Sequence, residues 1–207
     1  MKRTFMALFS LAIAPLGWTQ SGEPVGAPSF KPGDSWTYVR TDKFDRSRNA
    51  KYVVTIEWLS DSSHETSVQA LEGTFSGRGD QFTREMNPIV FENQKYEPYI
   101  PTFSFPLAPG KKWEGKYSFL RSGAQWNASR ASRVEGWETV KTAAGEFKAL
   151  KITYSGRVTN AAGTWSNNLQ GTSWYSPEVR RVVLSEIKAL SPAQDQRVEL
   201  VSFKPAQ

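Results

Sequence analysis

The sequence predicts an all-β domain in which about ten antiparallel strands form a curved sheet, either a barrel or a half-barrel. Apolar and polar residues alternate with a period of two along many segments, and turn-forming residues separate these segments. No stretch of eleven or more residues carries a clear apolar stripe at helical spacing, so we expect little helix. Alternation indicates strands with one buried and one wet face, and a flat sheet of this size is unusual.

Residues 1–20 have the pattern of a secretory signal peptide. Lys2 and Arg3 precede an apolar run of ten residues, 5–14, which ends at Pro15. This run is shorter than the ~20 residues that cross a bilayer, and no later stretch is long and apolar enough to do so. We therefore expect an exported protein, periplasmic or secreted, without stable membrane insertion.

The mature chain is expected to be a single β domain, residues 35–207, preceded by an extended lead-in, 21–34, with three Pro and three Gly. The clearest strand is 51–58, whose apolar face is expected to hold Tyr52, Val54, Ile56 and Trp58. Further strands are expected at 35–41, 64–72, 80–86, 112–120, 132–140, 146–158, 163–175, 180–188 and 195–203.

One segment, 88–110, breaks this rhythm because it holds five Pro and many aromatic residues. Proline lacks the N–H that a central strand donates, and long irregular segments inside compact domains are often functional. Two interpretations stay open: a strap that covers one end of the sheet with its aromatic side chains buried, or a lip over an apolar cavity. The best helical candidate of the chain is a short turn within 88–100.

The composition excludes several kinds of chemistry. The chain has no Cys, which excludes disulfides, thiolate metal ligands and a cysteine nucleophile. Its single histidine, His64, excludes a site with two histidine ligands, and we expect it at the surface because it follows a polar turn. Glu135 and Glu138 fall on opposite faces of a regular strand, so they do not fit a glycosidase pair. We expect no enzyme activity, no metal and no cofactor.

The net charge gives no reason to expect a nucleic-acid partner. It is +6 for the whole chain, and removal of Lys2 and Arg3 with the signal peptide leaves +4. The basic clusters are short, and an exported protein rarely meets nucleic acid. A small positive charge instead gives a weak, salt-screened attraction to anionic envelope surfaces.

Two segments carry a family resemblance: 136–154 (GWETVKTAAGEFKALKITY) and 172–186 (TSWYSPEVRRVVLSE). They resemble a pattern of uncharacterised exported all-β proteins of Gram-negative bacteria, in which an Ala-Gly turn precedes Phe-x-Ala-x-x-Ile. Residues 30–39 (FKPGDSWTYV) look like the first strand of such proteins. These families are similar to the half-barrels of the periplasmic lipoprotein carriers. The resemblance implies a concave apolar face able to hold an acyl chain, and it implies no catalytic residue.

We therefore expect an exported β protein that binds an apolar or amphipathic ligand or assists cell-envelope assembly. Its partners would be a hydrophobic small molecule or acyl chain, or another envelope protein. The expected ligand-binding residues are the lip residues Tyr99, Phe103, Phe105 and Leu107 and the wall residues Tyr52, Val54, Ile152 and Tyr154. Two alternatives stay open: a non-catalytic structural or protein-interaction module with a packed core, and a hydrolase.

Overall fold

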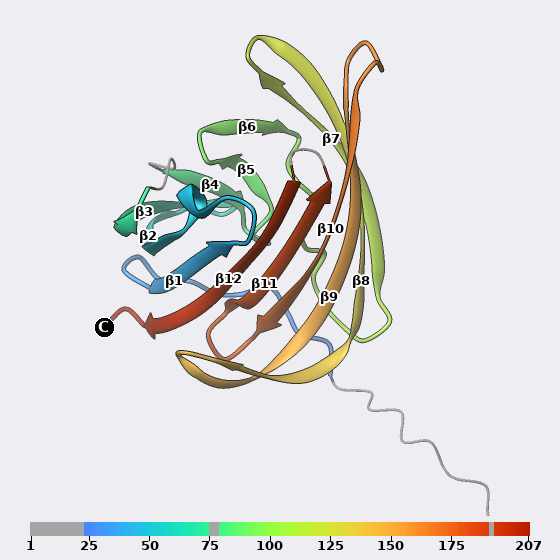
Figure 1. The fold of residues 1–207 in the computed structure, drawn as a ribbon. Helices are drawn as coiled ribbons and strands as arrows, with labels where there is room; N and C mark the ends of the chain where they lie inside the picture. Colours follow the sequence, from blue (N-terminus) through green and yellow to red (C-terminus); the bar gives the residue numbers. More distant parts are fainter. Residues whose placement is uncertain (1–22, 75–78, 191–192) are drawn as a thin grey trace, which may run out of the picture.

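The computed structural model describes residues 23–74, 79–190 and 193–207, which form a closed antiparallel β-barrel of twelve strands (Figure 1). Each strand pairs with its neighbours along the chain, and β1 pairs with both β2 and β12, so the sheet order follows the sequence. The predicted all-β class and curved sheet are confirmed, with twelve strands in place of about ten. The predicted signal peptide, residues 1–20, lies outside the described residues.

The strands differ greatly in length. β8 has 19 residues and β9 has 16, whereas β4, β5 and β6 have four each. In Figure 1 the hairpins β7–β8 and β9–β10 project beyond the rest of the barrel. The strands are β1 (Ser35–Asp42), β2 (Ala50–Leu59), β3 (Ser63–Gly73), β4 (Asp80–Thr83), β5 (Pro88–Phe91), β6 (Gln94–Glu97), β7 (Lys112–Arg121), β8 (Ala124–Thr142), β9 (Gly145–Asn160), β10 (Ser166–Ser176), β11 (Arg181–Leu190) and β12 (Ala193–Lys204).

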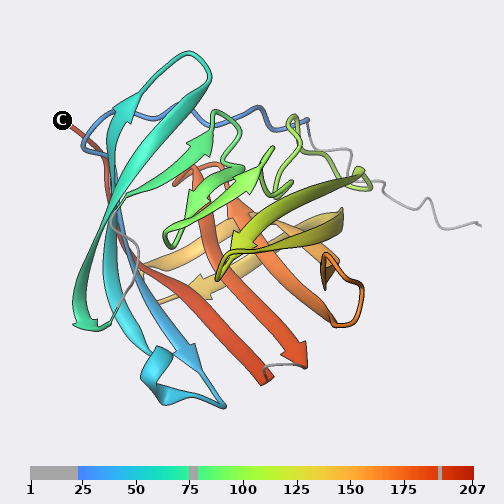
Figure 2. The same ribbon diagram turned by 90° about the horizontal axis from the view of Figure 1, so that it is seen from above.

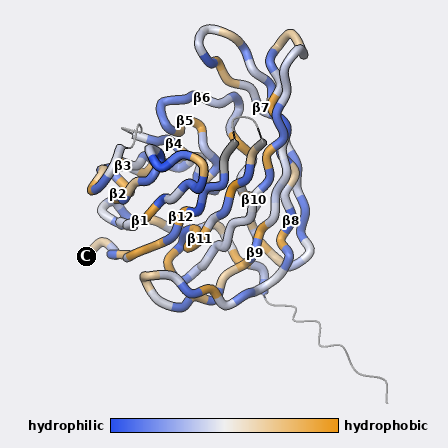
Figure 3. The backbone as a smooth tube through the Cα atoms, viewed as in Figure 1, coloured by the Kyte–Doolittle hydropathy of each residue, from blue (hydrophilic) through white to orange (hydrophobic). Residues whose placement is uncertain are grey.

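Hydrophilic and hydrophobic residues are mixed along the strands (Figure 3), as expected where one face of a strand is buried and the other is exposed. In β2 the side chains of Tyr52, Val54 and Ile56 are buried, as predicted. Trp58 is 52% exposed, so its expected place on the same face is wrong. The register shifts between Ile56 and Trp58, where the strand carries a β-bulge. Because an extra residue moves the following side chain to the other face, Trp58 turns outward.

The segment 88–100 holds two short strands, β5 and β6, so the predicted helical turn there is wrong. Pro88 opens β5, the one position in a strand at which a missing N–H is easily tolerated. Glu92 and Asn93 join the two strands with φ angles of 49° and 63°. Two consecutive residues with positive φ give a tight hairpin turn whose twist matches that of the strands. Among the described residues the helical content is a single 3₁₀ turn, η1 (Arg46–Arg48).

Residues 98–111, which we name the strap, connect β6 to β7 across one end of the barrel. Phe103 and Leu107 are buried in the core, and Phe105 packs against it. The lead-in runs beside the strap in both views (Figures 1 and 2), and Val25 and Leu107 exchange two backbone hydrogen bonds of 2.8 Å. Of the three aromatic residues of the strap, Phe103 is buried, Phe105 is partly buried and Tyr99 is 37% exposed, so the first interpretation holds for part of the strap.

A buried carboxylate, Asp34, fastens this end of the barrel. Its Oδ1 accepts hydrogen bonds of 2.9 Å from Arg180 Nη2 and from the backbone N–H of Ala206. Its Oδ2 accepts a 2.8 Å bond from the N–H of Lys31. Burial alone would raise the pKa of Asp34, but the hydrogen bonds from Ala206, Lys31 and Arg180 lower it below its usual value. Asp34 thus joins the lead-in, the β10–β11 turn and the C-terminal segment.

We expect Asp34→Ala to lower the free energy of unfolding by about 2–3 kcal/mol, because it leaves a partly buried guanidinium and two backbone donors without an acceptor. Asp34→Asn keeps one acceptor oxygen and should lose less. Urea denaturation followed by tryptophan fluorescence measures both. If Asp34→Ala unfolds at the wild-type urea concentration, this carboxylate does not hold the three segments together.

Candidate functional site

The interior of the barrel contains a cavity of about 280 Å³. Side chains from β1 to β5, from β10 to β12 and from the strap line it. Most of the wall is apolar, and its principal apolar and aromatic members are Tyr52, Val54, Val68, Phe82, Phe103 and Val198. The cavity therefore lies on the inner face that the sequence alternation predicts to be buried.

A buried asparagine fixes the floor of this cavity. Asn87, 2% exposed in the turn between β4 and β5, accepts a 2.7 Å hydrogen bond from the N–H of Phe103. Its Nδ2 donates a 3.1 Å bond to the carbonyl oxygen of the same residue. Both polar groups of a strap residue are thereby satisfied inside the core, where an unpaired one would be costly. Phe103 is held against the cavity together with Thr102 and Met86.

An ion pair between Arg40 and Glu92 also belongs to the lining. Arg40 Nη1 lies 3.2 Å from Glu92 Oε1, and the Glu92 side chain is 38% exposed while that of Arg40 is 14% exposed. Glu92, the more exposed partner, lies in the β5–β6 turn, where the wall of the cavity meets solvent. A partly exposed ion pair contributes little to stability, so the main effect of this pair is on the charge near this edge of the cavity.

Two further charged side chains reach the cavity, Arg181 of β11 and Asp80 of β4. The Arg181 guanidinium lies 4.8 Å from the ring centre of Trp36 and 5.9 Å from that of Phe82. Its Nη1 is buried and has no hydrogen-bond partner. Asp80 Oδ1 accepts a 2.9 Å bond from the N–H of Glu92. Burial raises the pKa of Asp80 to about 6, and the charge of Arg181 opposes this rise.

His64 is buried, so its expected surface position is wrong. It is 2% exposed and lies between Phe30 and Phe82, with ring-centre distances of 4.9 and 5.2 Å. It pairs in the sheet with Leu59 and Phe82, because the polar turn ends at Ser63 and His64 is the first inward residue of β3. Burial, together with the nearby charge of Arg181, lowers its pKa to about 4. His64 is therefore a neutral core residue at pH 7.

The expected wall residues separate into two groups. Tyr52 and Val54 line the cavity, whereas Ile152 is 1% exposed in the core of β9. Tyr154 is also buried, and the guanidinium carbon of Arg130 lies 3.5 Å from its ring centre. Strands β2 and β9 lie on different sides of the barrel. Both show the same alternation of apolar and polar residues, but this does not bring these four side chains to one site.

The expected lip residues also separate. Phe103 lines the cavity, and Phe105 stacks on it at 5.6 Å and meets Tyr175 edge-on at 5.5 Å. Leu107 is fully buried, and Tyr99 is 37% exposed. Sequence reasoning did not single out Asp80 or Arg181 as members of the site. The only signal for Arg181 was its place in a short basic cluster, which does not tell an inward from an outward side chain.

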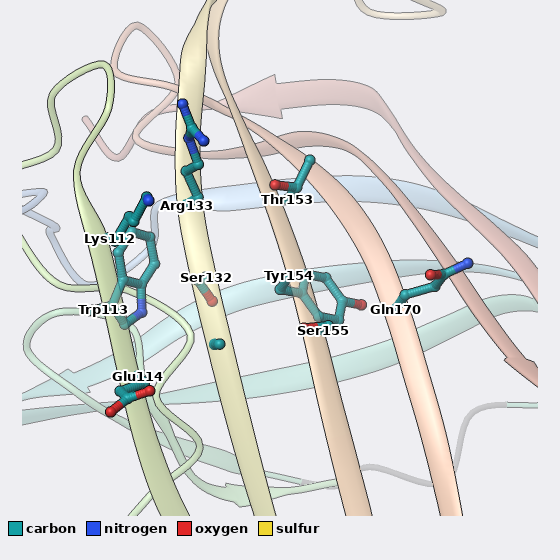
Figure 4. Close-up of a pocket in the computed structure, with 10 residues that line it drawn as sticks. Lys112, Trp113, Glu114, Ser132, Arg133, Thr153, Tyr154, Ser155 and Gln170 are labelled. Carbon is teal, nitrogen blue, oxygen red and sulfur yellow. The ribbon is translucent and has the colours of Figure 1, made fainter.

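A second hollow of about 560 Å³ lies where β7, β8, β9 and β10 run side by side (Figure 4). Exposed Lys112, Glu114 and Arg133 line it together with small side chains such as Ala131 and Ser155. Tyr154, an expected wall residue, also belongs to this lining. The charges alternate in sign and are solvated, so nothing in this hollow selects one ligand chemistry.

Two further searches concern metal and membrane. Within residues 23–74, 79–190 and 193–207, no group of three or more His, Asp or Glu side chains could hold a metal ion. In the same residues, the structure contains no helix with the length and hydrophobicity needed to cross a bilayer.

The fold matches those of exported proteins from Gram-negative bacteria. A predicted lipoprotein of Parabacteroides distasonis superposes with a TM-score of 0.58 and 13% identity over 88% of this chain and 100% of that one. A predicted exported protein with a YmcC-like fold from Bacteroides fragilis gives 0.54 and 15% over 87% and 99%. The resemblance inferred from sequence is thus confirmed at the level of fold. No family model and no curated protein matches the sequence.

The raised pKa of Asp80 has a measurable consequence for stability. Its value in the folded protein, about 6, lies above the model-compound value of 3.8, so the folded state binds this proton more tightly. The resulting stabilisation is complete below about pH 4 and is lost as the pH rises through 6. We expect Asp80→Asn, which cannot ionise, to match the wild type near pH 4. At neutral pH it should exceed the wild type by up to about 3 kcal/mol.

Urea unfolding of both proteins between about pH 4 and 7.5 measures this difference. His64, whose lowered pKa acts with the opposite sign, is common to both proteins, so its effect cancels in the comparison. A stability difference that stays constant with pH would contradict the assignment of a buried, proton-binding Asp80.

Proposed function

We propose that the protein is an exported binding protein of the cell envelope, which holds one apolar or amphipathic molecule inside its barrel. The interior cavity carries this proposal, because it is lined mainly by apolar side chains and has a charged opening at Arg40 and Glu92. Ligand sites are typically concave and mostly apolar, with a few polar groups that set orientation.

The size of the cavity limits the ligand. About 280 Å³ is near the lower end of the ~300–1,000 Å³ typical of small-molecule sites. At ~30 Å³ for each water-sized unit, the space takes about nine or ten non-hydrogen atoms. A short alkyl or acyl chain, or one end of a longer chain that leaves through the opening, fits this volume.

Two features support a location in the envelope. Residues 1–20 have the charge and hydropathy pattern of an export signal. The similar folds come from a predicted lipoprotein and a predicted exported protein. A binding role also agrees with the place of His64. Its pKa is lowered to about 4, which makes it a weak base, and it is stacked between Phe30 and Phe82 and is not among the residues that line the cavity.

Filling the cavity tests the proposal. Val68 of β3 faces the cavity, and its neighbour Gln69 is exposed on the other face. We expect Val68→Trp to abolish binding of a fluorescent fatty acid, because the indole occupies much of the free volume. Gln69→Trp, the matched control, should bind like the wild type, and circular dichroism checks that both variants keep the fold.

Native mass spectrometry of the protein purified from the periplasm is the second measurement. We expect a bound species in the wild type that is absent from Val68→Trp. A ligand-free wild type that also fails to bind fluorescent fatty acids would favour the packed interaction module instead.

A further inference from the structure

The cavity contains a positive charge that the protein itself leaves incompletely satisfied. Arg181 Nη1 is buried without a hydrogen-bond partner, and Arg181 takes part in none of the ion pairs found among the described residues. Arginine keeps its proton under all ordinary conditions, so it cannot relieve this situation by becoming neutral. A buried donor of this kind costs free energy until an acceptor reaches it.

The groups around Arg181 compensate its charge only in part. The faces of Trp36 and Phe82 attract it weakly at 4.8 and 5.9 Å. The Tyr38 hydroxyl donates its own proton to the carbonyl oxygen of Val182 at 2.9 Å, and its oxygen accepts a hydrogen bond from the Arg181 side chain. These contacts hold the guanidinium in place, and they leave Nη1 free.

The acidic side chains of the cavity are engaged elsewhere. Glu92 pairs with Arg40 at 3.2 Å. Asp80 accepts the backbone N–H of Glu92 and does not come within ion-pair distance of Arg181 in the described structure. The cavity therefore offers one cation without a carboxylate partner, next to an apolar wall that includes Val54, Val68 and Phe103.

From this geometry we infer that the ligand is an anionic amphiphile, whose carboxylate or phosphate head group binds Arg181 while its chain lies against the apolar wall. The inference rests on the proposed function and specifies the ligand class. A planar guanidinium matches the oxygen pair of a carboxylate or phosphate, and such charge-assisted hydrogen bonds are among the stronger ones in proteins.

Isothermal titration calorimetry with three ligands of equal chain length tests the inference: octanoate, octyl phosphate and octan-1-ol. We expect the wild type to bind at least one of the two anions ten or more times as tightly as the alcohol. The anion that binds with the higher affinity identifies the preferred head group, carboxylate or phosphate. This comparison needs no substitution, so it does not depend on the folding of a variant.

The substitution Arg181→Met then removes the charge while keeping an unbranched apolar side chain. We expect it to weaken binding of the preferred anion at least tenfold and to leave the affinity for octan-1-ol within about twofold of wild type. Arg157→Met is the matched control, because Arg157 is exposed and donates a hydrogen bond to Ser166 on the neighbouring strand β10. It should bind all three ligands like the wild type.

The results separate a failure of the inference about Arg181 from a failure of the proposed function. Equal affinity of the wild type for the anions and the alcohol overturns the role of Arg181 and leaves the apolar binding site in place. An anion preference that survives in Arg181→Met also overturns it. If none of the three ligands binds the wild type, this inference and the proposed function fall together.

Discussion

The structure depends on the volume that a closed sheet of twelve strands encloses. Eight strands give a barrel just wide enough for its own inward side chains to fill, and the diameter grows with each added strand. Here inward side chains of β1, β2 and β8 to β12 meet in an aromatic-rich core that includes Trp36, Tyr52 and Tyr175. The strap adds Phe103 and Leu107 to this core from one end. The cavity is the part of the interior that neither the strand side chains nor the strap side chains fill.

The strands pair over very different lengths. β8 and β9 pair over sixteen positions, whereas β6 and β7 pair over two, Tyr96 with Phe119 and Glu97 with Ser118. Aromatic contacts reinforce this short seam, since the Tyr96 ring lies 5.8 Å from that of Tyr117 and 5.5 Å from that of Phe119. The cavity is lined instead by side chains of β1 to β5, of β10 to β12 and of the strap.

Local periodicity predicted the class of fold because alternation is a property of each strand by itself. It placed Tyr52, Val54 and Ile56 on the buried face of β2. It failed at Trp58, because a bulge reverses the face and leaves no signal in the alternation. It also missed β5 and β6, whose four residues are too few to show a period.

The site was predicted less completely than the fold, because a site depends on which strands lie opposite one another. Phe103 was expected to face a ligand from the aromatic character of its segment, and it does line the cavity. Ile152 and Tyr154 share the same alternation but belong to β9, away from that space. Arg181 faces the cavity because of how β11 pairs with β10. The local sequence around Arg181 does not reveal this pairing.

A ligand held inside the barrel beside Arg181 would be visible in a crystal structure of the protein grown in the presence of decanoate. We expect density for a chain between Val54 and Phe103, with head-group oxygens about 2.7–2.9 Å from the Arg181 guanidinium. An interior in which side chains close the space, with no density other than protein, would contradict this expectation.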